Sequence, residues 1–163
     1  ICSTRIQTGH GLPGLQTVFE CAKTDRDVKI VADGGIKTSG DIVKALAAGA
    51  DFVMLGSILA GTDETPGDIF ENRRGERYKA YRGMASKEAQ MDWHGRFSSL
   101  EGISTTIPYK GPVGFILEEL ERGIRSGLSY SGCRTIEELH KNAKFVEQTY
   151  AGQIESSTHI LGR

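Results

Sequence analysis

The residues best suited to chemistry stand near the start of the chain, where a cysteine lies among hydroxyl groups and a fixed positive charge. The segment 1–11 contains Cys2, Thr4 and Arg5. A cysteine is nucleophilic only as the thiolate, and Arg5 would favour that form if its guanidinium lay near the sulfur. A single cysteine near a chain end is more often a small, partly buried residue, and this segment alone favours that interpretation. Glycines at positions 9 and 11 predict that the segment is a loop.

Two turns further along could bind a phosphate. Gly35 and the pair Gly56-Ser57 each follow a short apolar run that predicts a strand. Backbone N–H groups at such turns, with a helix N-terminus behind each, can bind one anion between them. Asp33 ends the first run, and a carboxylate that accepts two hydroxyl hydrogen bonds suits a ribose diol. An ordinary turn at 33–35 is the alternative, which these features alone leave open.

The elements that must position these residues alternate between short strands and helices. Apolar runs at 28–32 and 52–55 predict buried parallel strands. Helical spacing of apolar residues predicts helices over 13–23, 40–50, 87–93, 113–126 and 135–144, with another starting at 58–60. This alternation predicts an α/β fold with parallel strands. Two adjacent strand ends that share a phosphate are typical of (β/α)8 barrels.

The alternation is interrupted after residue 61. Residues 71–77 predict the tip of a hairpin, flanked by aromatic residues on both sides. The segment 94–106 is polar, contains glycine and has no hydrophobic period, so we expect an exposed, mobile segment. Thr135 begins a capping-box pattern with Glu138, and the polar tail 150–163 predicts an arm.

Composition bounds the class of protein. The 163 residues suffice for one domain, and 38% hydrophobic with 25% charged residues predict a soluble globular chain. A net charge of -1 gives no electrostatic reason to expect nucleic acid or an anionic membrane as partner. The three cysteines are widely spaced, which argues against disulfides or a zinc site and predicts a reducing compartment, the cytoplasm. No apolar run approaches the roughly 20 residues of a membrane span.

Several motifs, taken in order, resemble the IMP dehydrogenase/GMP reductase family. They are Ile-Cys-Ser-Thr-Arg at 1–5, Ala-Asp-Gly-Gly-Ile at 32–36, Gly-Ala-Asp-Phe-Val-Met-Leu-Gly-Ser at 49–57, Tyr-Lys-Ala-Tyr-Arg-Gly-Met at 78–84 and Tyr-Lys-Gly at 109–111. The resemblance implies a (β/α)8 TIM barrel, of which residues 1–163 are the carboxyl-terminal half. A hairpin precedes the last helices, and so does a flap at about 85–107. The carboxyl-terminal arm is at about 150–163. An amino-terminal segment or fragment would complete the barrel, and the assembly would be a homotetramer.

The resemblance also implies roles for individual residues. Cys2 matches the nucleophile that attacks purine C2 to form a covalent thioether, and Thr4 matches a hydroxyl beside the purine. Asp33 matches the ribose ligand. The remaining substrate ligands are Gly35, Gly56, Ser57 and Tyr81 for the phosphate, and Gly83, Met84 and Ala85 for the base. Cys2, Glu155 and Ser156 would contribute to an intersubunit site for a monovalent cation, potassium.

Two activities share this nucleophile. A GMP reductase converts GMP and NADPH to IMP and ammonia with a Thr-Glu pair, which Thr4 and Glu101 match. An IMP dehydrogenase converts IMP, NAD and water to XMP and NADH with an Arg-Tyr pair, whereas this chain has Arg96-Phe97. We therefore favour GMP reductase and keep Arg96 as a catalytic candidate. Residues 81–83 and 125–128 resemble the dehydrogenase, and a Glu-Gly pair also occurs in many bacterial dehydrogenases.

A hypothesis of another class is a non-catalytic barrel fragment. Half a barrel exposes unpaired strand edges, which favours aggregation and misfolding. The catalytic positions are intact, however, which argues against a decayed remnant. The choice between NAD and NADP depends on contacts expected mainly in the other half, and the start of the chain within a predicted loop suggests a piece of a longer protein.

Overall fold

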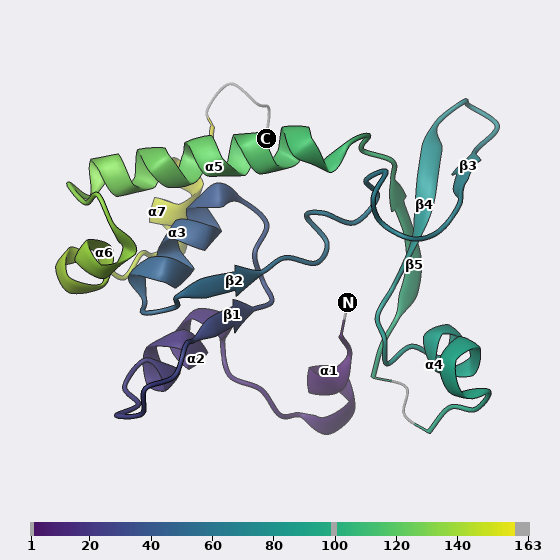
Figure 1. The fold of residues 1–163 in the computed structure, drawn as a ribbon, viewed down its shortest axis with the longest axis horizontal. Coiled ribbons are helices and arrows are strands. Elements are labelled where there is room, and N and C mark those ends of the chain that lie inside the picture. The colour runs from purple at the N-terminus through teal and green to yellow at the C-terminus, as the bar shows by residue number, and fades with distance from the viewer. Residues whose placement is uncertain (1, 99–100, 159–163) are drawn as a thin grey trace.

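A computed structural model describes residues 2–98 and 101–158 of the chain (Figure 1). The helices are α1 (Thr4–Thr8), α2 (Gly14–Cys21), α3 (Ser39–Ala47), α4 (Lys87–His94), α5 (Val113–Tyr130), α6 (Ile136–Asn142) and α7 (Tyr150–Glu155). The strands are β1 (Val31–Asp33), β2 (Phe52–Met54), β3 (Ile69–Glu71), β4 (Arg77–Arg82) and β5 (Ser104–Pro108). The predicted capping box of α6 is present in part: the Thr135 hydroxyl accepts from the Glu138 N–H at 3.1 Å.

One part of the molecule is an α/β unit. Strands β1 and β2 are parallel, with Ala32 opposite Val53 and Asp33 opposite Met54. Helix α5 crosses the same side of the sheet as α3, and α6 lies at its end (Figure 1). The apolar core between these helices consists of Ile36, Ile42, Leu46, Leu120, Cys133 and Leu139. The α/β class predicted from the alternating pattern is confirmed.

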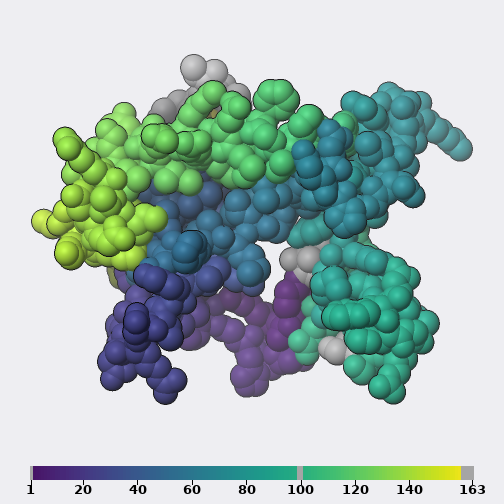
Figure 2. All heavy atoms as spheres, viewed as in Figure 1, coloured from purple at the N-terminus to yellow at the C-terminus, as the bar shows by residue number. Residues whose placement is uncertain are grey.

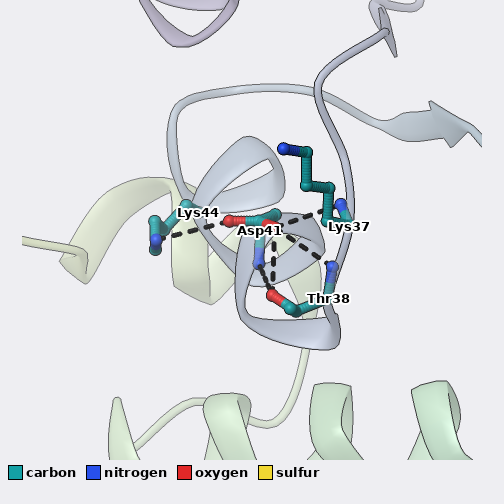
Figure 3. Close-up of polar contacts among 4 residues, drawn as sticks. All are labelled: Lys37, Thr38, Asp41 and Lys44. Carbon is teal, nitrogen blue, oxygen red and sulfur yellow. Dashed lines mark hydrogen bonds and ion pairs between the residues drawn. The ribbon is translucent and has the colours of Figure 1, made fainter. Parts of the chain in front are cut away.

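A complete capping box sets the start of α3 (Figure 3). The Thr38 hydroxyl accepts from the Asp41 N–H at 3.2 Å, and the Asp41 carboxylate accepts from the N–H groups of Thr38 and Lys37 at 3.0 and 3.1 Å. Partial burial opposes ionisation, but these hydrogen bonds and the Lys44 ammonium lower the pKa of the Asp41 carboxyl. The helix therefore begins at a defined point, four residues after Gly35.

The second part is an antiparallel sheet in the order β3-β4-β5. Strands β3 and β4 pair around residues 72–76, where the sequence predicts the tip of a hairpin. Strand β5 pairs with β4 from Tyr78↔Pro108 to Arg82↔Ser104. The expectation that 94–106 is irregular throughout is therefore wrong, because β5 begins at Ser104. Its two threonines and an isoleucine are β-branched, which favours an extended backbone over a mobile loop.

The sequence predicted that the first eleven residues form a loop. This is wrong in part, because α1 spans Thr4–Thr8. The Ser3 carbonyl accepts from the N–H groups of Ile6 and Gln7, which closes the first turn. Gly9 follows the helix with φ 71°, and its N–H donates to the Arg5 carbonyl. The glycines that indicated a loop thus end a short helix, since glycine readily adopts this left-handed conformation.

The helix expected to start at 58–60 is also absent. The Gly56 carbonyl accepts from the N–H groups of Leu59 and Ala60, so the chain makes tight turns there. At Gly61 φ is 88°, and a Cβ would lie 2.5 Å from the Pro108 carbonyl oxygen. The close approach of β5 turns the chain away before a helix can form.

The two parallel strands are half-buried, whereas the sequence predicted buried strands. Ala32 is 7% exposed and faces the helices, whereas Val31 and Phe52 are 47% and 58% exposed. Side chains alternate between the two faces of a sheet, and the described residues cover only one face of this pair.

The space-filling view shows how the two parts meet (Figure 2). The N-terminal segment lies beneath the strands of the α/β unit and beside the residues of the α4 region. Helix α5 covers the opposite side of the molecule. Among the described residues, no helix has the length and apolar character needed to cross a bilayer.

Candidate active site

A cavity of about 360 Å³ lies between the carboxyl ends of β1 and β2, the start of the chain and the segments that flank α4. Its volume is typical of small-molecule sites, which range over roughly 300–1,000 Å³. The cavity brings together most residues predicted from the sequence. They are Cys2, Thr4, Asp33, Gly35, Gly56, Ser57, Tyr81, Gly83, Met84, Ala85 and Glu101.

The Thr4 hydroxyl connects a thiol to a carboxylate. Thr4 Oγ1 accepts from the Cys2 thiol at 2.9 Å and donates to Glu101 Oε2 at 2.7 Å. Thr4 and Glu101 are 97 residues apart in sequence, so the fold creates this contact. A hydroxyl has one proton to donate, so Thr4 can serve the sulfur or the carboxylate at one moment, but not both. The three groups can therefore pass a proton along a short hydrogen-bonded path.

The surroundings of Cys2 favour its thiolate. The hydrogen bond between the thiol and the Thr4 hydroxyl, and the one from the Thr4 N–H 3.3 Å from Sγ, lower the pKa of the Cys2 thiol. Slight desolvation and the negative charge of Glu101 oppose this effect. Cys2 is exposed, so its sulfur is accessible to a ligand in the cavity. A thiolate that is both accessible and hydrogen-bonded has the properties of a nucleophile.

Backbone hydrogen bonds hold the three segments of this site together. The Ser3 N–H donates to the Glu101 carbonyl at 2.7 Å, beside an isolated antiparallel bridge between Cys2 and Gly102. The Gly102 N–H in turn donates to the Ala85 carbonyl at 3.2 Å. The positions of the thiol and the carboxylate thus depend on main-chain contacts as well as on the Thr4 hydroxyl.

The turn after β1 has a conformation that requires glycine. Gly34 and Gly35 have φ values of 99° and 78°, in the left-handed region. Both glycines line the cavity beside the exposed Asp33. The site can therefore present peptide N–H donors and a carboxylate to one ligand.

The turn after β2 faces the antiparallel sheet. A Cβ built on Gly56 would lie 3.2 Å from the Tyr81 hydroxyl, so the tyrosine side chain reaches this turn from β4. Helix α3 begins four residues after Gly35, whereas the element that follows Gly56-Ser57 is strand β3 and not a helix. The expectation of two helix N-termini behind one anion is wrong at this second turn, because the chain continues through the tight turns that lead to Gly61.

Two arginines lie outside the cavity. The Arg5 guanidinium donates to the Leu12 carbonyl, so it serves the N-terminal segment rather than the Cys2 sulfur. Arg96 is exposed and is not among the residues that line the cavity, so the structure does not bring this catalytic candidate to the site. Part of the segment that follows Arg96, residues 99 and 100 of the predicted flap, lies outside the described residues.

The predicted cation ligands are not brought together within the chain. Glu155 and Ser156 end α7, which lies behind α5 and away from the start of the chain (Figure 1). The Ser156 hydroxyl donates to the Gly152 carbonyl at 2.9 Å, within its own helix. Among the described residues, no cluster of His, Cys, Asp and Glu could hold a metal ion. The three predicted ligands therefore do not meet within one chain, and the end of the predicted arm, 159–163, lies outside the described residues.

The sequence interpretation missed four residues of the cavity wall: Gly34, Ile36, Met54 and Gly102. Met54 could have been found, because it pairs with Asp33 in the strand register and ends the neighbouring strand. Gly102 is needed for a close approach, since a Cβ there would lie 2.3 Å from the backbone nitrogen of Ser86. Only the Glu-Gly pair at 101–102 indicated it in the sequence.

Comparisons with known proteins identify the family. Residues 1–159 match the family model of the IMP dehydrogenase / GMP reductase domain. The chain belongs to the IMP dehydrogenase/GMP reductase family. Enzymes of this family are NAD(P)-dependent oxidoreductases.

The chain is similar both to IMP dehydrogenases and to GMP reductases. Inosine-5'-monophosphate dehydrogenase from Nitrosopumilus maritimus is 45% identical over 98% of the chain and 36% of its own length. GMP reductase from Leishmania major is 43% identical over 100% of the chain and 35% of its own length. A similar solved structure is a cysteine-to-alanine variant of GMP reductase from Trypanosoma brucei in complex with guanosine 5'-monophosphate. It is 45% identical, has a TM-score of 0.92, and the match covers 99% of this chain and 35% of that chain. The chain thus spans about a third of the length of the curated relatives it matches.

Proposed function

We propose that this chain carries the nucleotide-binding and nucleophilic residues of a GMP reductase, which converts GMP and NADPH to IMP and ammonia. The observation that carries the proposal is the path from the Cys2 thiol through the Thr4 hydroxyl to the Glu101 carboxylate, with distances of 2.9 and 2.7 Å. Release of ammonia needs a proton at the departing amine, and this path can deliver one.

In the first half of the reaction, the Cys2 thiolate would add to C2 of GMP and form a carbon–sulfur bond. The bond between C2 and the amino group would then break, and the amine would leave as ammonia. The proton that the thiol gave up is the proton that the amine needs, so the half-reaction is balanced without a further acid. Thr4 would transfer it, with Glu101 holding it in between.

In the second half, a bound nicotinamide supplies the hydride that adds to C2 while the carbon–sulfur bond breaks. Cys2 would leave as thiolate. One proton from solvent, passed through Glu101 and Thr4, would restore the thiol, so the complete cycle consumes one proton along with the hydride. The cavity of about 360 Å³ has room for a purine nucleotide. The choice of NADPH over NAD follows from the reductase chemistry and not from any described residue.

The remaining cavity residues would orient the nucleotide. Asp33 would accept hydrogen bonds from the ribose hydroxyls, as its exposed carboxylate at the end of β1 allows. The backbone of Gly35, Gly56 and Ser57, with the Tyr81 hydroxyl, would bind the phosphate. The backbone of 83–85 would contact the base, and in this position the purine C2 would lie near the Cys2 sulfur. The complex of the Trypanosoma brucei relative with guanosine 5'-monophosphate supports this class of ligand.

We also propose that residues 1–163 form the carboxyl-terminal part of a (β/α)8 barrel, with the hairpin and flap inserted before the last helices. Val31, Phe52 and Met54 lie on one face of the parallel pair and are 47%, 58% and 54% exposed. Parallel strands are normally covered on both faces. A preceding amino-terminal segment would cover this face and complete the barrel, and a homotetramer would be the active assembly.

IMP dehydrogenase is the second candidate, and the sequence comparisons favour it as much as the first. Inosine-5'-monophosphate dehydrogenase from Aquifex aeolicus is 48% identical over 98% of the chain. A dehydrogenase would need a group that activates water. The residue after Arg96 is Phe97, which lacks a hydroxyl, and its ring lies 4.9 Å from the Lys87 ammonium. This arrangement supports the reductase.

An assay of the intact protein separates the two candidates. Consumption of NADPH with GMP, together with one ammonia per IMP formed, is the expected result. Formation of NADH from IMP and NAD would contradict it and establish the dehydrogenase. Glu101→Gln should lower ammonia release by at least about a hundredfold, the usual contribution of a proton-transfer group. The matched control is Glu88→Gln on α4, whose carboxylate accepts from the Ser104 hydroxyl instead of Thr4.

The non-catalytic fragment predicts a different outcome. It requires that the purified protein consist of a 17.7 kDa species alone and turn over neither nucleotide. A longer chain, or a companion fragment seen by intact mass spectrometry, together with turnover would exclude it.

A further inference from the structure

The cavity presents negative charge but no cationic side chain to a nucleotide. Asp33 and Glu101 are among the residues that line it, whereas none of the described lining residues is lysine, arginine or histidine. A nucleotide 5'-monophosphate carries nearly two negative charges at neutral pH. Among the described lining residues, uncharged N–H and hydroxyl donors would have to balance that charge, unless a cation acts on them from behind.

Lys110 stands directly behind the turn after β2. Its ammonium donates to the carbonyl oxygen of Ser57 at 2.9 Å and to that of Ile58 at 3.0 Å. The backbone around it is tied to the same loop, because the Lys110 N–H donates to the Gly61 carbonyl at 2.9 Å. The Asp63 N–H donates to the Gly111 carbonyl at 3.0 Å. The lysine is therefore fixed to the loop by its main chain and by its side chain.

An ammonium on a carbonyl oxygen strengthens the N–H of the same peptide as a donor. The Ile58 carbonyl shares its peptide with the Leu59 N–H, which donates to the Gly56 carbonyl at 3.1 Å. The Gly56 carbonyl in turn shares its peptide with the N–H of Ser57, which lines the cavity. Hydrogen bonds in such a chain polarise one another. Within the described ranges 2–98 and 101–158, no carboxylate lies at ion-pair distance from Lys110, so nothing there neutralises its charge. Lys110 is an exposed residue, and partial desolvation of its ammonium lowers the pKa of Lys110.

A second lysine contacts the chain that continues from this turn and provides a contrast. Lys79 on β4 is 3% exposed, and its ammonium donates to the carbonyl oxygens of Thr62 and Thr65 at 2.9 and 2.5 Å. These carbonyls lie five or more residues beyond Ser57 in sequence. Lys79 thus anchors the far end of the loop, whereas Lys110 acts on the peptides next to the phosphate turn.

We propose that Lys110 is a positioning residue for the nucleotide phosphate. It supplies positive charge to the phosphate site through the hydrogen-bonded series of the Ile58 carbonyl, the Leu59 N–H and the Gly56–Ser57 peptide, without contact with the substrate. The inference rests on the proposed function, because it takes the phosphate to bind at Gly56-Ser57.

The test compares a ligand that has the phosphate with one that lacks it. In the intact protein, dissociation constants of GMP and guanosine are measured for the wild type, Lys110→Met, Lys110→Gln and Lys110→Arg. We expect the Met and Gln variants to bind GMP about tenfold more weakly, since hydrogen bonds to charged groups are about twice as strong as neutral ones. Guanosine affinity should change by less than about twofold, and Lys110→Arg should keep most of the GMP affinity because it keeps the charge.

Lys141→Met is the matched control, because it removes the same charge from an exposed position on α6. Equal weakening of GMP and guanosine would overturn the inference, since it would show a general structural role. Unchanged GMP affinity in both neutral variants would also overturn it. Lys110→Gln keeps a neutral donor, and so it tests the charge even if Lys110→Met does not fold. A wild type that binds GMP no more tightly than guanosine would instead contradict the proposed phosphate site.

Discussion

The α/β unit and the segments that carry the reactive groups are held together by different forces. In the unit of β1, β2, α3, α5 and α6, Leu139 and Ile42 are only 1% and 2% exposed. In the N-terminal segment, α1 has no buried residue and Cys2 is exposed. The position of the N-terminal segment depends on the backbone hydrogen bond from Ser3 to Glu101 and on the hydrogen bond from the Thr4 hydroxyl to the Glu101 carboxylate.

This difference separates stability from chemistry. Apolar burial contributes roughly 25 cal/mol for each Å² removed from water, so the free energy of unfolding resides mainly in the core of the α/β unit. The reactive groups lie where polar contacts between three segments meet, and those contacts can be changed singly. We therefore expect substitutions in one region to change activity and substitutions in the other to change stability.

The largest effect is expected at the thiol. Cys2→Ala should lower turnover by at least about a thousandfold, because it removes the proposed nucleophile. Since Cys2 is exposed, the free energy of unfolding should change by no more than about 0.5 kcal/mol. Steady-state assays and urea unfolding of the same preparation measure both quantities. A variant that keeps a tenth of the activity would show that Cys2 is not the nucleophile.

The converse effect is expected in the core. Leu139→Ala should destabilise the protein by about 2–5 kcal/mol, because it leaves a cavity at a side chain that is 1% exposed. Leu12→Ala is the control, since Leu12 is 58% exposed, and it should change stability by no more than about 0.5 kcal/mol. Equal effects of the two substitutions in urea unfolding would contradict the division between the regions.

A pair of glycines within α5 tests the packing of this unit more finely. A Cβ on Gly123 would lie 2.1 Å from Ser39 Oγ and 2.4 Å from Ser39 Cβ, so Gly123→Ala should cost about 1–3 kcal/mol by forcing α3 and α5 apart. A Cβ on Gly114 would meet nothing within 4 Å, so Gly114→Ala should stabilise the protein by about 0.5–1 kcal/mol through helix propensity. Thermal unfolding measures both, and the same sign for both variants would reject this packing.

A smaller effect is expected on the titration of Cys2. The Thr4 hydroxyl lowers the pKa of the thiol, so Thr4→Val should raise that pKa. The thiolate would then form only at higher pH, and the pH profile of alkylation at Cys2 should move upward. The rate of iodoacetamide modification, followed by mass spectrometry of the Cys2 peptide, measures this. A profile that stays in place or moves to lower pH would exclude the hydrogen bond as the cause.

The sequence predicted the α/β unit better than the segments around it. The apolar periodicity of α3 and α5 reports the same packing that stabilises them, so local pattern and tertiary structure agree there. In the N-terminal segment, Gly9 indicated a loop but ends a helix, and β5 has too little alternation to be recognised without its pairing to β4. The exposed faces of β1 and β2 could not be predicted, because burial depends on which segments cover the sheet.

The site shows the same limit. The strand-end turns at Gly35 and Gly56 were predictable from glycine and strand patterns, since these are local. The pairing of Thr4 with Glu101 came only from the family resemblance, because no local pattern connects residues 97 positions apart. Lys110 is part of the Tyr-Lys-Gly motif of the resemblance, but nothing in the sequence indicated its role, since its partners are backbone carbonyls, which every residue has.

The account depends most directly on Cys2, Thr4 and Glu101 acting as one unit. A double-mutant cycle of Thr4→Val and Glu101→Gln, with ammonia release from GMP by the intact protein as the readout, tests this. If Glu101 acts through the Thr4 hydroxyl, the double variant should be no slower than the slower single variant, within about twofold. A double variant whose loss equals the product of the two single losses would show that the residues act independently and would contradict the account.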